Sequence, residues 1–285
     1  MKHFYIITNE QKDEGLKVTR KMYEYIFKRG GTCGYAPNRS PGSLGFDPEV
    51  IPKDTECVFC VGGDGTLIRA ARDVVGRQFP VLGVNRGHIG YLCELDENNV
   101  FSAIDQLMAG TYTLEERMLL RGFWESKGEK HSPHLALNDI VIHRSGLLQV
   151  LNLIIYVNGE YLNTYSADGI IIATPTGSTA YSMSAGGPIV DPKAKLILIT
   201  PISPHALNSK SIVLGAEDEV VVEIGSRRVE EDEEAEVSFD GDLSFRVAVG
   251  DRIVIRRARE NMRFLRLSRL SFLEILRKKM QEYAR

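Results

Sequence analysis

An apolar strand, a glycine turn and the start of a helix follow one another in the stretch Cys57-Val58-Phe59-Cys60-Val61-Gly62-Gly63-Asp64-Gly65-Thr66-Leu67. Glycines let backbone N–H groups approach an anion closely, and the following helix directs the positive end of its dipole to the same place. Asp64 fits there if a Mg²⁺ ion offsets its charge, or if its carboxylate takes a proton from an attacking hydroxyl. The alternative is a tight turn in which Asp64 only caps the helix. The stretch therefore predicts phosphate handling at a strand-to-helix turn, with this structural alternative left open.

Strands and helices alternate on both sides of this turn. Residues 4–8 and 79–85 have the composition of strands, and a helical pattern from Leu16 to Phe27 closes at Gly30-Gly31. A further helix is expected from Val100 to Met108. Strands separated by helices predict a Rossmann-like parallel sheet, in which ligands bind at the carboxyl ends of the strands. Asp64 and Asn85 both fall at such ends.

The pattern changes after Gly110, where short β-rich segments with turns between them predict a sandwich-like second domain. The expected strands are 135–143, 150–157, 170–174, 194–200, 220–224, 237–239 and 252–256. Ser271-Phe272-Leu273-Glu274 has the pattern of a capping box and predicts a C-terminal helix. We expect an α/β domain over 1–111 and a β-rich domain over 112–267. The helix in 268–285 would pack back on a domain, the first being a candidate, or on a partner subunit.

Composition excludes several classes of function. The chain has 285 residues, of which 43% are hydrophobic and 26% charged, with a net charge of −3. This charge gives no general attraction to nucleic acid or to an anionic membrane, and the apolar runs are too short to span a bilayer. The N-terminal residues lack the layout of a signal peptide, so we expect a cytoplasmic protein.

The cysteines do not form a disulfide framework in this sequence. Cys57 and Cys60 make a CxxC pattern, but on a strand their side chains point to opposite faces, which disfavours chelation or a disulfide. Buried packing is expected for Cys33, Cys57, Cys60 and Cys93.

Three polar parts of the sequence can be interpreted either as surface structure or as functional sites. The loop from Pro37 to Pro48 is a candidate flap or an inert surface loop. The acidic stretch 228–236 is expected to be a solvated hairpin. The arginines near the C-terminus suggest a strand edge protected by charge rather than a polyanion site. They are Arg256, Arg257, Arg259, Arg263, Arg266 and Arg269.

A second glycine motif runs from Asp168 to Pro188 and reads as a strand followed by a turn crowded with hydroxyls and small residues. Such a turn can present several donors to a polar ligand, and Tyr181 can offer a ring face or a hydroxyl. A decorated β-turn is the weaker alternative, because the hydroxyl density directly after a buried strand is high.

Together these motifs resemble the NAD kinase family, whose pattern is a GGDGT loop, an Asn-Glu/Asp pair and a segment of the form DG…TPTGSTAYS.S.GGP. Here they are Gly62 to Thr66, Asn138-Asp139, and Asp168 to Pro188. The segments 85–91 and 200–207 are also similar to family motifs. The resemblance covers roughly residues 55–245, and the combination is far more specific than the GGDGT loop alone, which other kinase families share.

The resemblance implies a role for each matching residue. Asp64 would be the general base on the adenosine ribose 2′-hydroxyl of NAD, and Gly62, Gly63, Gly65 and Thr66 would cradle ATP phosphates. Arg69 would reach a phosphate, with an exposed helix cation as the alternative. Tyr91 would flank the adenine pocket, Asn138 and Asp139 would bind NAD, and Asp168 would contact the nicotinamide end. The remaining dinucleotide-binding candidates are Thr176, Thr179, Ala180, Tyr181, Ser182, Met183, Ser184 and Ser203.

The implied reaction is transfer of the γ-phosphate of ATP, with Mg²⁺, to NAD, giving NADP and ADP; the sequence names no metal ligand. The family is usually homodimeric or homotetrameric. The sequence leaves open whether NAD or NADH is preferred, and whether polyphosphate replaces ATP. A lipid kinase of the diacylglycerol type shares the GGDGT loop, but the hydroxyl-rich segment favours a polar acceptor. A non-catalytic dinucleotide sensor is the other alternative, against which the intact loop with Asp64 weighs.

Overall fold

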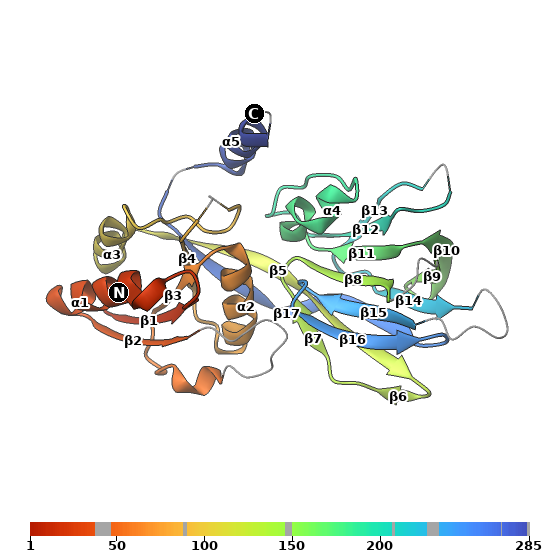
Figure 1. The fold of residues 1–285 in the computed structure, drawn as a ribbon, viewed down its shortest axis with the longest axis horizontal. Coiled ribbons are helices and arrows are strands. Elements are labelled where there is room, and N and C mark those ends of the chain that lie inside the picture. Colours follow the sequence, from red (N-terminus) through yellow and green to blue (C-terminus); the bar gives the residue numbers. More distant parts are fainter. Residues whose placement is uncertain are drawn as a thin grey trace. The chain divides into compact units, whose positions relative to one another are not determined.

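The computed structural model describes residues 1–37, 47–87, 90–145, 150–206, 209–226, 234–268 and 270–283. The chain forms two compact units, one of Met1–Glu116 with Met262–Arg285 and one of Arg117–Asn261. The long strands β5 (Thr113–Ser126) and β17 (Arg252–Arg266) belong partly to each (Figure 1). The domain limits expected from the sequence stay a prediction.

The first unit is built on a parallel sheet of order β2-β1-β3-β4, as its expected class requires. Its strands are β1 (His3–Thr8), β2 (Thr32–Pro37), β3 (Cys57–Gly62) and β4 (Val81–Asn85), and Phe264 of β17 pairs with Val81. Its helices are η1 (Glu14–Leu16), α1 (Lys17–Lys28), η2 (Pro48–Val50), α2 (Asp64–Val74), η3 (Val75–Arg77), α3 (Val100–Met108) and α5 (Phe272–Tyr283).

The strand order of this unit reverses between β1 and β3, because β2 lies on one side of β1 and β3 lies on the other. In open α/β sheets, ligands bind outside the carboxyl ends of the strands at such a switch point. Asn9 follows β1 and Gly63 follows β3, so both segments lie at this point. Helices cover both faces, since α1 and α3 share a buried cluster with alternate strand residues and α2 packs on β3 and β4.

The second unit is a β sandwich, also as expected. One sheet contains β9 (Leu151–Val157), β10 (Glu160–Ala167), β14 (Val220–Gly225), β17 and β5 with β6 (Glu129–Lys130) and β7 (His134–Ala136). The other has the order β13-β12-β11-β8-β15-β16. Its strands are β8 (Asp139–Arg144), β11 (Gly169–Ala173), β12 (Leu196–Ile202), β13 (Ile212–Gly215), β15 (Glu234–Phe239) and β16 (Leu243–Ala248). The short helices η4 (Thr176–Thr179) and α4 (Tyr181–Ser184) follow β11.

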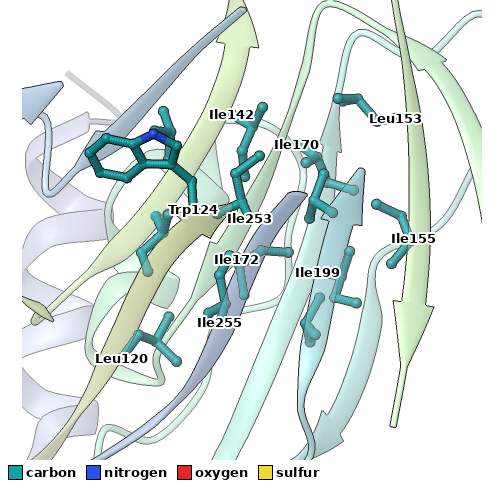
Figure 2. Packing of buried hydrophobic residues seen from close by; sticks show 14 of the residues in the cluster. Leu120, Trp124, Ile142, Leu153, Ile155, Ile170, Ile172, Ile199, Ile253 and Ile255 are labelled. Atoms are coloured by element: carbon teal, nitrogen blue, oxygen red, sulfur yellow. The ribbon is translucent and has the colours of Figure 1, made fainter. Parts of the chain in front are cut away.

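Buried aliphatic side chains from both sheets fill the sandwich (Figure 2). Ile170 and Ile172 of β11 belong to this core, whereas Ile171 and Ala173 belong to a smaller cluster on the other face of the sheet. Both faces of β11 are therefore buried, which explains the uninterrupted apolar run that the sequence showed. This strand ends directly before the hydroxyl-rich segment and fixes its starting point.

Several strands were not predicted from the sequence, namely β2, β5, β6, β10, β13 and β16. In β10, residues 160–164 are all exposed, so no apolar alternation marks the strand. The edge strand expected around the C-terminal arginines is wrong, because β17 pairs with β14, β5 and β4 inside its sheet. Arg256 and Arg257 instead pair with Glu219 and Glu217, and Arg266 pairs with Glu115. Arg269 lies outside the described residues.

The cysteines are free thiols, and Cys57, Cys60 and Cys93 are buried as expected, while Cys33 is only half-buried. Cys57 belongs to the cluster of α1 and α3, and the alternation of β3 places Cys60 on the opposite face. Burial raises the pKa of Cys33 to about 12 and that of Cys60 further still. At neutral pH these thiols are protonated and do not act as nucleophiles.

Most of the loop considered as a candidate flap or an inert surface loop, residues 38–46, lies outside the described residues, as do residues 228–233 of the acidic stretch. The capping box at the start of α5 is confirmed: Glu274 N donates to Ser271 Oγ (3.2 Å), and Ser271 N donates to Glu274 Oε2 (2.8 Å). In the described part of the chain, no helix is both long and apolar enough to cross a membrane.

Trp124 is the single tryptophan of the chain and lies 9% exposed in the sandwich core, so its fluorescence reports on the second unit. We predict that Ile172→Ala lowers the free energy of unfolding of this unit by about 2–5 kcal/mol, because it opens a cavity in a fully buried site. Val213, 54% exposed on β13, supplies the control variant Val213→Ala. Denaturant unfolding followed by Trp124 fluorescence measures both, and equal midpoints for the two variants would contradict the assigned packing.

Candidate functional site

The glycine turn after β3 is as short as a strand-to-helix connection can be. β3 ends at Gly62, α2 begins at Asp64, and Gly63 alone joins them. A Cβ on Gly62 would lie 2.4 Å from Thr66 Oγ1, so only glycine lets the helix start this close to the strand. The first turn of α2 therefore begins at the carboxyl end of β3, where its free N–H groups can bind an anion.

The carboxylate of Asp64 does not cap its own helix but accepts hydrogen bonds from a distant loop. Tyr91 N and Leu92 N donate to Oδ2 at 2.7 and 3.3 Å, and Cys93 N donates to Oδ1 at 3.1 Å. A Cβ on Gly90 would lie 2.0 Å from Asp64 Oδ1, so this approach depends on glycine at position 90. A carboxylate accepts about four hydrogen bonds. Three of these are made by the backbone of residues 91–93, so the Asp64 carboxylate has a fixed direction.

A lysine that sequence reasoning missed lies beside the same turn. Gly63 has Lys12 Nζ 2.8 Å from the position that a Cβ would take. The turn carrying Lys12 is held by Lys12 N donating to Asn9 O (3.0 Å), while Asn9 Nδ2 donates to Thr66 Oγ1 (3.2 Å). The carboxylate of the buried Asp13 accepts from Val18 N and Thr19 N, both at 2.9 Å. An ammonium group is thus presented to the glycine turn by an ordered segment.

The other expected residues of the first unit are arranged around this turn. Thr66 is 2% exposed and its hydroxyl accepts from Asn9, so it supports the turn from below. Arg69 is half-buried on α2, with Nη1 4.0 Å from the position of a Cβ on Gly65. Tyr91 is half-buried, and its N–H is one of those that hold Asp64. The expected phosphate-turn residues therefore form one group with Lys12.

In the second unit, the Asn138-Asp139 pair is held by the hydroxyl-rich segment. Asn138 O accepts from Thr174 N (2.8 Å), and Thr174 Oγ1 donates to Leu137 O (2.6 Å). A Cβ on Gly177 would lie 2.1 Å from Asn138 O, so the two expected motifs touch through their backbones. Asn138 remains half-buried and accessible, whereas Asp139 is 4% exposed.

A second missed residue, Asp240, holds the same pair from the other side. Its carboxylate accepts from Leu137 N, Asn138 N and Asp139 N at 2.9, 2.7 and 3.2 Å. Burial, followed by the negative charge of Asp240, raises the pKa of Asp139 to about 8. This shift favours the neutral carboxylic acid, which can donate a hydrogen bond as well as accept one.

The remaining hydroxyl-rich residues divide into buried supports and accessible groups. Thr176 is 5% exposed and accepts from Nη1 of the buried Arg117 (3.2 Å). Ser182 is fully buried, and its hydroxyl pairs with Thr200 Oγ1 at 3.1 Å. Tyr181 and Ser184 are exposed, and Thr179, Ala180 and Met183 are half-buried. Ser203 is exposed in a left-handed conformation with φ of 45°.

Asp168 lies at the edge of a hollow of about 320 Å³ lined by His143, Arg144, Asp168, Tyr181 and Ile202. Arg144 of β8 donates through Nε to Asp168 Oδ1 (3.1 Å), and its backbone N donates to Asp168 O (3.0 Å). The hollow therefore offers a cation, a carboxylate and an aromatic ring to a ligand. Arg144 escaped sequence reasoning because it comes from the neighbouring strand.

The structure thus brings the expected residues together as two groups, one in each unit. Asp64, its glycines, Arg69 and Tyr91 form the first, and Asn138, Asp139, Asp168 and the hydroxyl-rich segment form the second. Among the described residues, no cluster of three or more His, Cys, Asp or Glu side chains is arranged to hold a metal ion.

Comparison with known families and proteins agrees with these groups. The ATP-NAD kinase N-terminal domain model matches residues 39–112, and the ATP-NAD kinase C-terminal domain model matches residues 137–267. An NAD kinase of Agathobacter rectalis is 54% identical over 286 residues, covering 100% of both chains. An NAD kinase of Lachnospira eligens is 43% identical over 98% of this chain and 100% of its own.

Two solved structures share the fold. Yeast NADH kinase complexed with NADH has a TM-score of 0.87 at 22% identity and covers 99% of this chain and 88% of its own. An NAD kinase from Archaeoglobus fulgidus in complex with ATP has a TM-score of 0.76 at 22% identity, covering 98% of each chain.

Gly90→Ala tests how tightly the Asp64 carboxylate is packed. We predict that it lowers the free energy of unfolding by about 1–3 kcal/mol, because the new Cβ would overlap the carboxylate and overpacking costs about this much. Gly87→Ala is the matched control, since a Cβ there meets nothing within 4 Å. Thermal unfolding followed by circular dichroism compares the two, and a Gly90→Ala protein as stable as Gly87→Ala would refute the close approach.

Proposed function

This chain belongs to the ATP-NAD kinase family, and from that premise we propose that it transfers the γ-phosphate of ATP to the 2′-hydroxyl of the adenosine ribose of NAD, giving NADP and ADP. The single observation that carries the proposal is the fixed carboxylate of Asp64 beside the glycine turn. It offers a base next to a place suited to phosphate, which is what transfer to a hydroxyl needs. The comparisons do not support a lipid kinase or a non-catalytic sensor.

The donor would bind at the turn of Gly62, Gly63, Gly65 and Thr66. The N-terminus of α2 and the ammonium group of Lys12 would supply positive charge to the phosphates, and Arg69 would add to it. Mg²⁺ would enter as part of the MgATP substrate. Mg²⁺ commonly binds through substrate phosphates and one or two carboxylates.

The acceptor would bind through the second unit. Asn138 and Asp139 would hold the adenosine end of NAD and Asp168 the nicotinamide end, with accessible groups of residues 179–184 and Ser203 alongside. Asp64 would take the proton from the ribose 2′-oxygen as that oxygen bonds to the γ-phosphorus and the bond to the ADP oxygen breaks. Alignment and charge neutralisation supply most of the catalysis in such a transfer, because its transition state is loose.

The cellular compartment and the oligomeric state are further parts of the proposal. The four free cysteines are consistent with a reducing cytoplasm. We propose a homodimer or homotetramer built through the β-rich unit. Strand β10 ends the order of its sheet and exposes Tyr161 (61%) and Leu162 (36%), which would suit a subunit contact.

We predict that the purified protein forms NADP from MgATP and NAD, and that Asp64→Asn lowers kcat by ~10²–10⁴-fold because the base is lost. NADP is measured with an NADP-specific dehydrogenase. In parallel assays, NADH or diacylglycerol replaces NAD as the acceptor, and polyphosphate replaces ATP as the donor. The new amide would place an NH₂ group near backbone N–H donors, so stability and NAD binding of the variant are measured too. Activity of Asp64→Asn close to that of the unaltered protein would remove the base assignment, and absence of NADP with proven NAD binding would favour a sensor.

We predict that Lys12→Ala raises the KM for ATP by ~10–100-fold, since a charge-assisted hydrogen bond is worth about 1.5–3 kcal/mol. The KM for NAD should change little. Lys53→Ala is the control, because Lys53 is exposed and precedes the amino end of β3, away from the glycine turn. Steady-state kinetics with ATP as the varied substrate decides, and equal values for the two variants would exclude Lys12 from the donor site.

A further inference from the structure

Asp240 lies in the turn between β15 and β16 and has an unusual conformation for a non-glycine residue. Its φ is 54°, and the following Gly241 has a φ of 63°. This left-handed backbone costs energy for a residue with a side chain, although aspartate tolerates it better than most. The strain is offset by hydrogen bonds, because Asp240 N donates to Asp139 O (3.0 Å) and the carboxylate accepts the N–H groups of residues 137–139.

These bonds determine how Asn138 and Asp139 are presented. The N–H groups of residues 137–139 are held by Asp240, while Asn138 O and Leu137 O are held by Thr174. The peptide groups that carry the two side chains are thus fixed from both directions. Three backbone donors also stabilise the ionised form of the Asp240 carboxylate.

The environment of Asp139 makes a second negative charge costly. Asp139 is 4% exposed and follows Asn138 at the start of β8. Charged or titratable groups on nearby elements include Asp240 and Asp242 of the β15–β16 turn, Glu236 of β15, Arg117 of β5, His134 of β7, and His143 and Arg144 of β8. Arg117 donates to Thr176, and His134 packs against Phe239 and Phe245. Burial is the first cause of the raised pKa of Asp139, and the charge of Asp240 is the second.

We propose that Asp240 is a positioning residue for the dinucleotide subsite: its carboxylate fixes the Asn138-Asp139 turn so that the carboxyl group of Asp139 donates a hydrogen bond to bound NAD. This inference rests on the proposed function of Asn138 and Asp139. Acceptors on the adenosine part, such as ribose oxygens or adenine ring nitrogens, are the chemical class that such a donor recognises.

The proposal predicts a pH dependence of NAD binding. The pKa of Asp139 is raised from 3.8 to about 8 in the folded protein, so the donor is present below about pH 8 and is lost as the pH rises through that value. The same shift makes folding less favourable as the pH rises from about 4 to about 8, since the unfolded chain ionises first. NAD affinity should therefore fall above pH 8. The contribution of Asp139 to the free energy of unfolding of the wild-type protein should change little in that range.

The test is calorimetric titration of the full-length protein with NAD at pH values on both sides of 8. Asp240→Asn is expected to weaken NAD binding ~10-fold or more below pH 8, in line with the loss of a charge-assisted hydrogen bond, and to move the fall in affinity to lower pH. The kcat at saturating NAD should change much less than the KM. Asp139→Asn, whose amide donates but cannot ionise, should remove the fall in affinity above pH 8.

Asp251→Asn is the matched control. Asp251 is a 6% exposed aspartate of the same unit whose carboxylate accepts from Ala248 N (2.9 Å), in a turn without a site residue. If Asp240→Asn shifts neither the affinity nor its pH dependence relative to Asp251→Asn, the proposal is overturned. A wild-type affinity that is constant across pH 8 overturns the role of a protonated Asp139. Failure of the unaltered protein to bind or phosphorylate NAD is a different result, which rejects the proposed function itself.

Discussion

The candidate site of the first unit depends on one set of hydrogen bonds, which the backbone N–H groups of residues 91–93 donate to the Asp64 carboxylate. It joins the start of α2 to the segment that follows β4, and it sets the direction of the side chain on which the proposed chemistry rests. The interaction needs a carboxylate at position 64 and no side chain at position 90. A charged group at a helix start is therefore satisfied by the backbone of another segment rather than by its own helix.

The same device recurs at two more places. Asp13 accepts backbone N–H groups at the start of α1 and thereby orders the turn that carries Lys12. Asp240 does the same for the Asn138-Asp139 pair. At these two places a carboxylate to which no substrate contact is assigned orders the turn that carries a candidate site residue. A hydrogen bond from a backbone N–H group to an ionised carboxylate is stronger than one to a neutral acceptor, so a single side chain suffices to hold a whole turn.

The sequence predicted what is encoded locally. The βα alternation, the glycine turn, the capping box of α5 and the opposite faces of Cys57 and Cys60 all follow from neighbouring residues. Arg144, Lys12 and Asp240 were missed because each reaches its partner across the sheet or from another turn, and no local pattern marks that encounter. The strand β10 lacks alternation, and the arginines of β17 looked like an edge because their glutamate partners lie elsewhere in the chain.

The contact between Gly177 and the backbone of Asn138 has a consequence for how such chains diversify. Two motifs that look separate in the sequence pack directly against each other, since a Cβ on Gly177 has no room beside Asn138 O. A substitution in one motif is tolerated only if the new side chain fits the backbone of the other motif. Segments exchanged between distant homologues would therefore have to travel as a pair, and drift in either motif is slowed by the partner it must keep fitting.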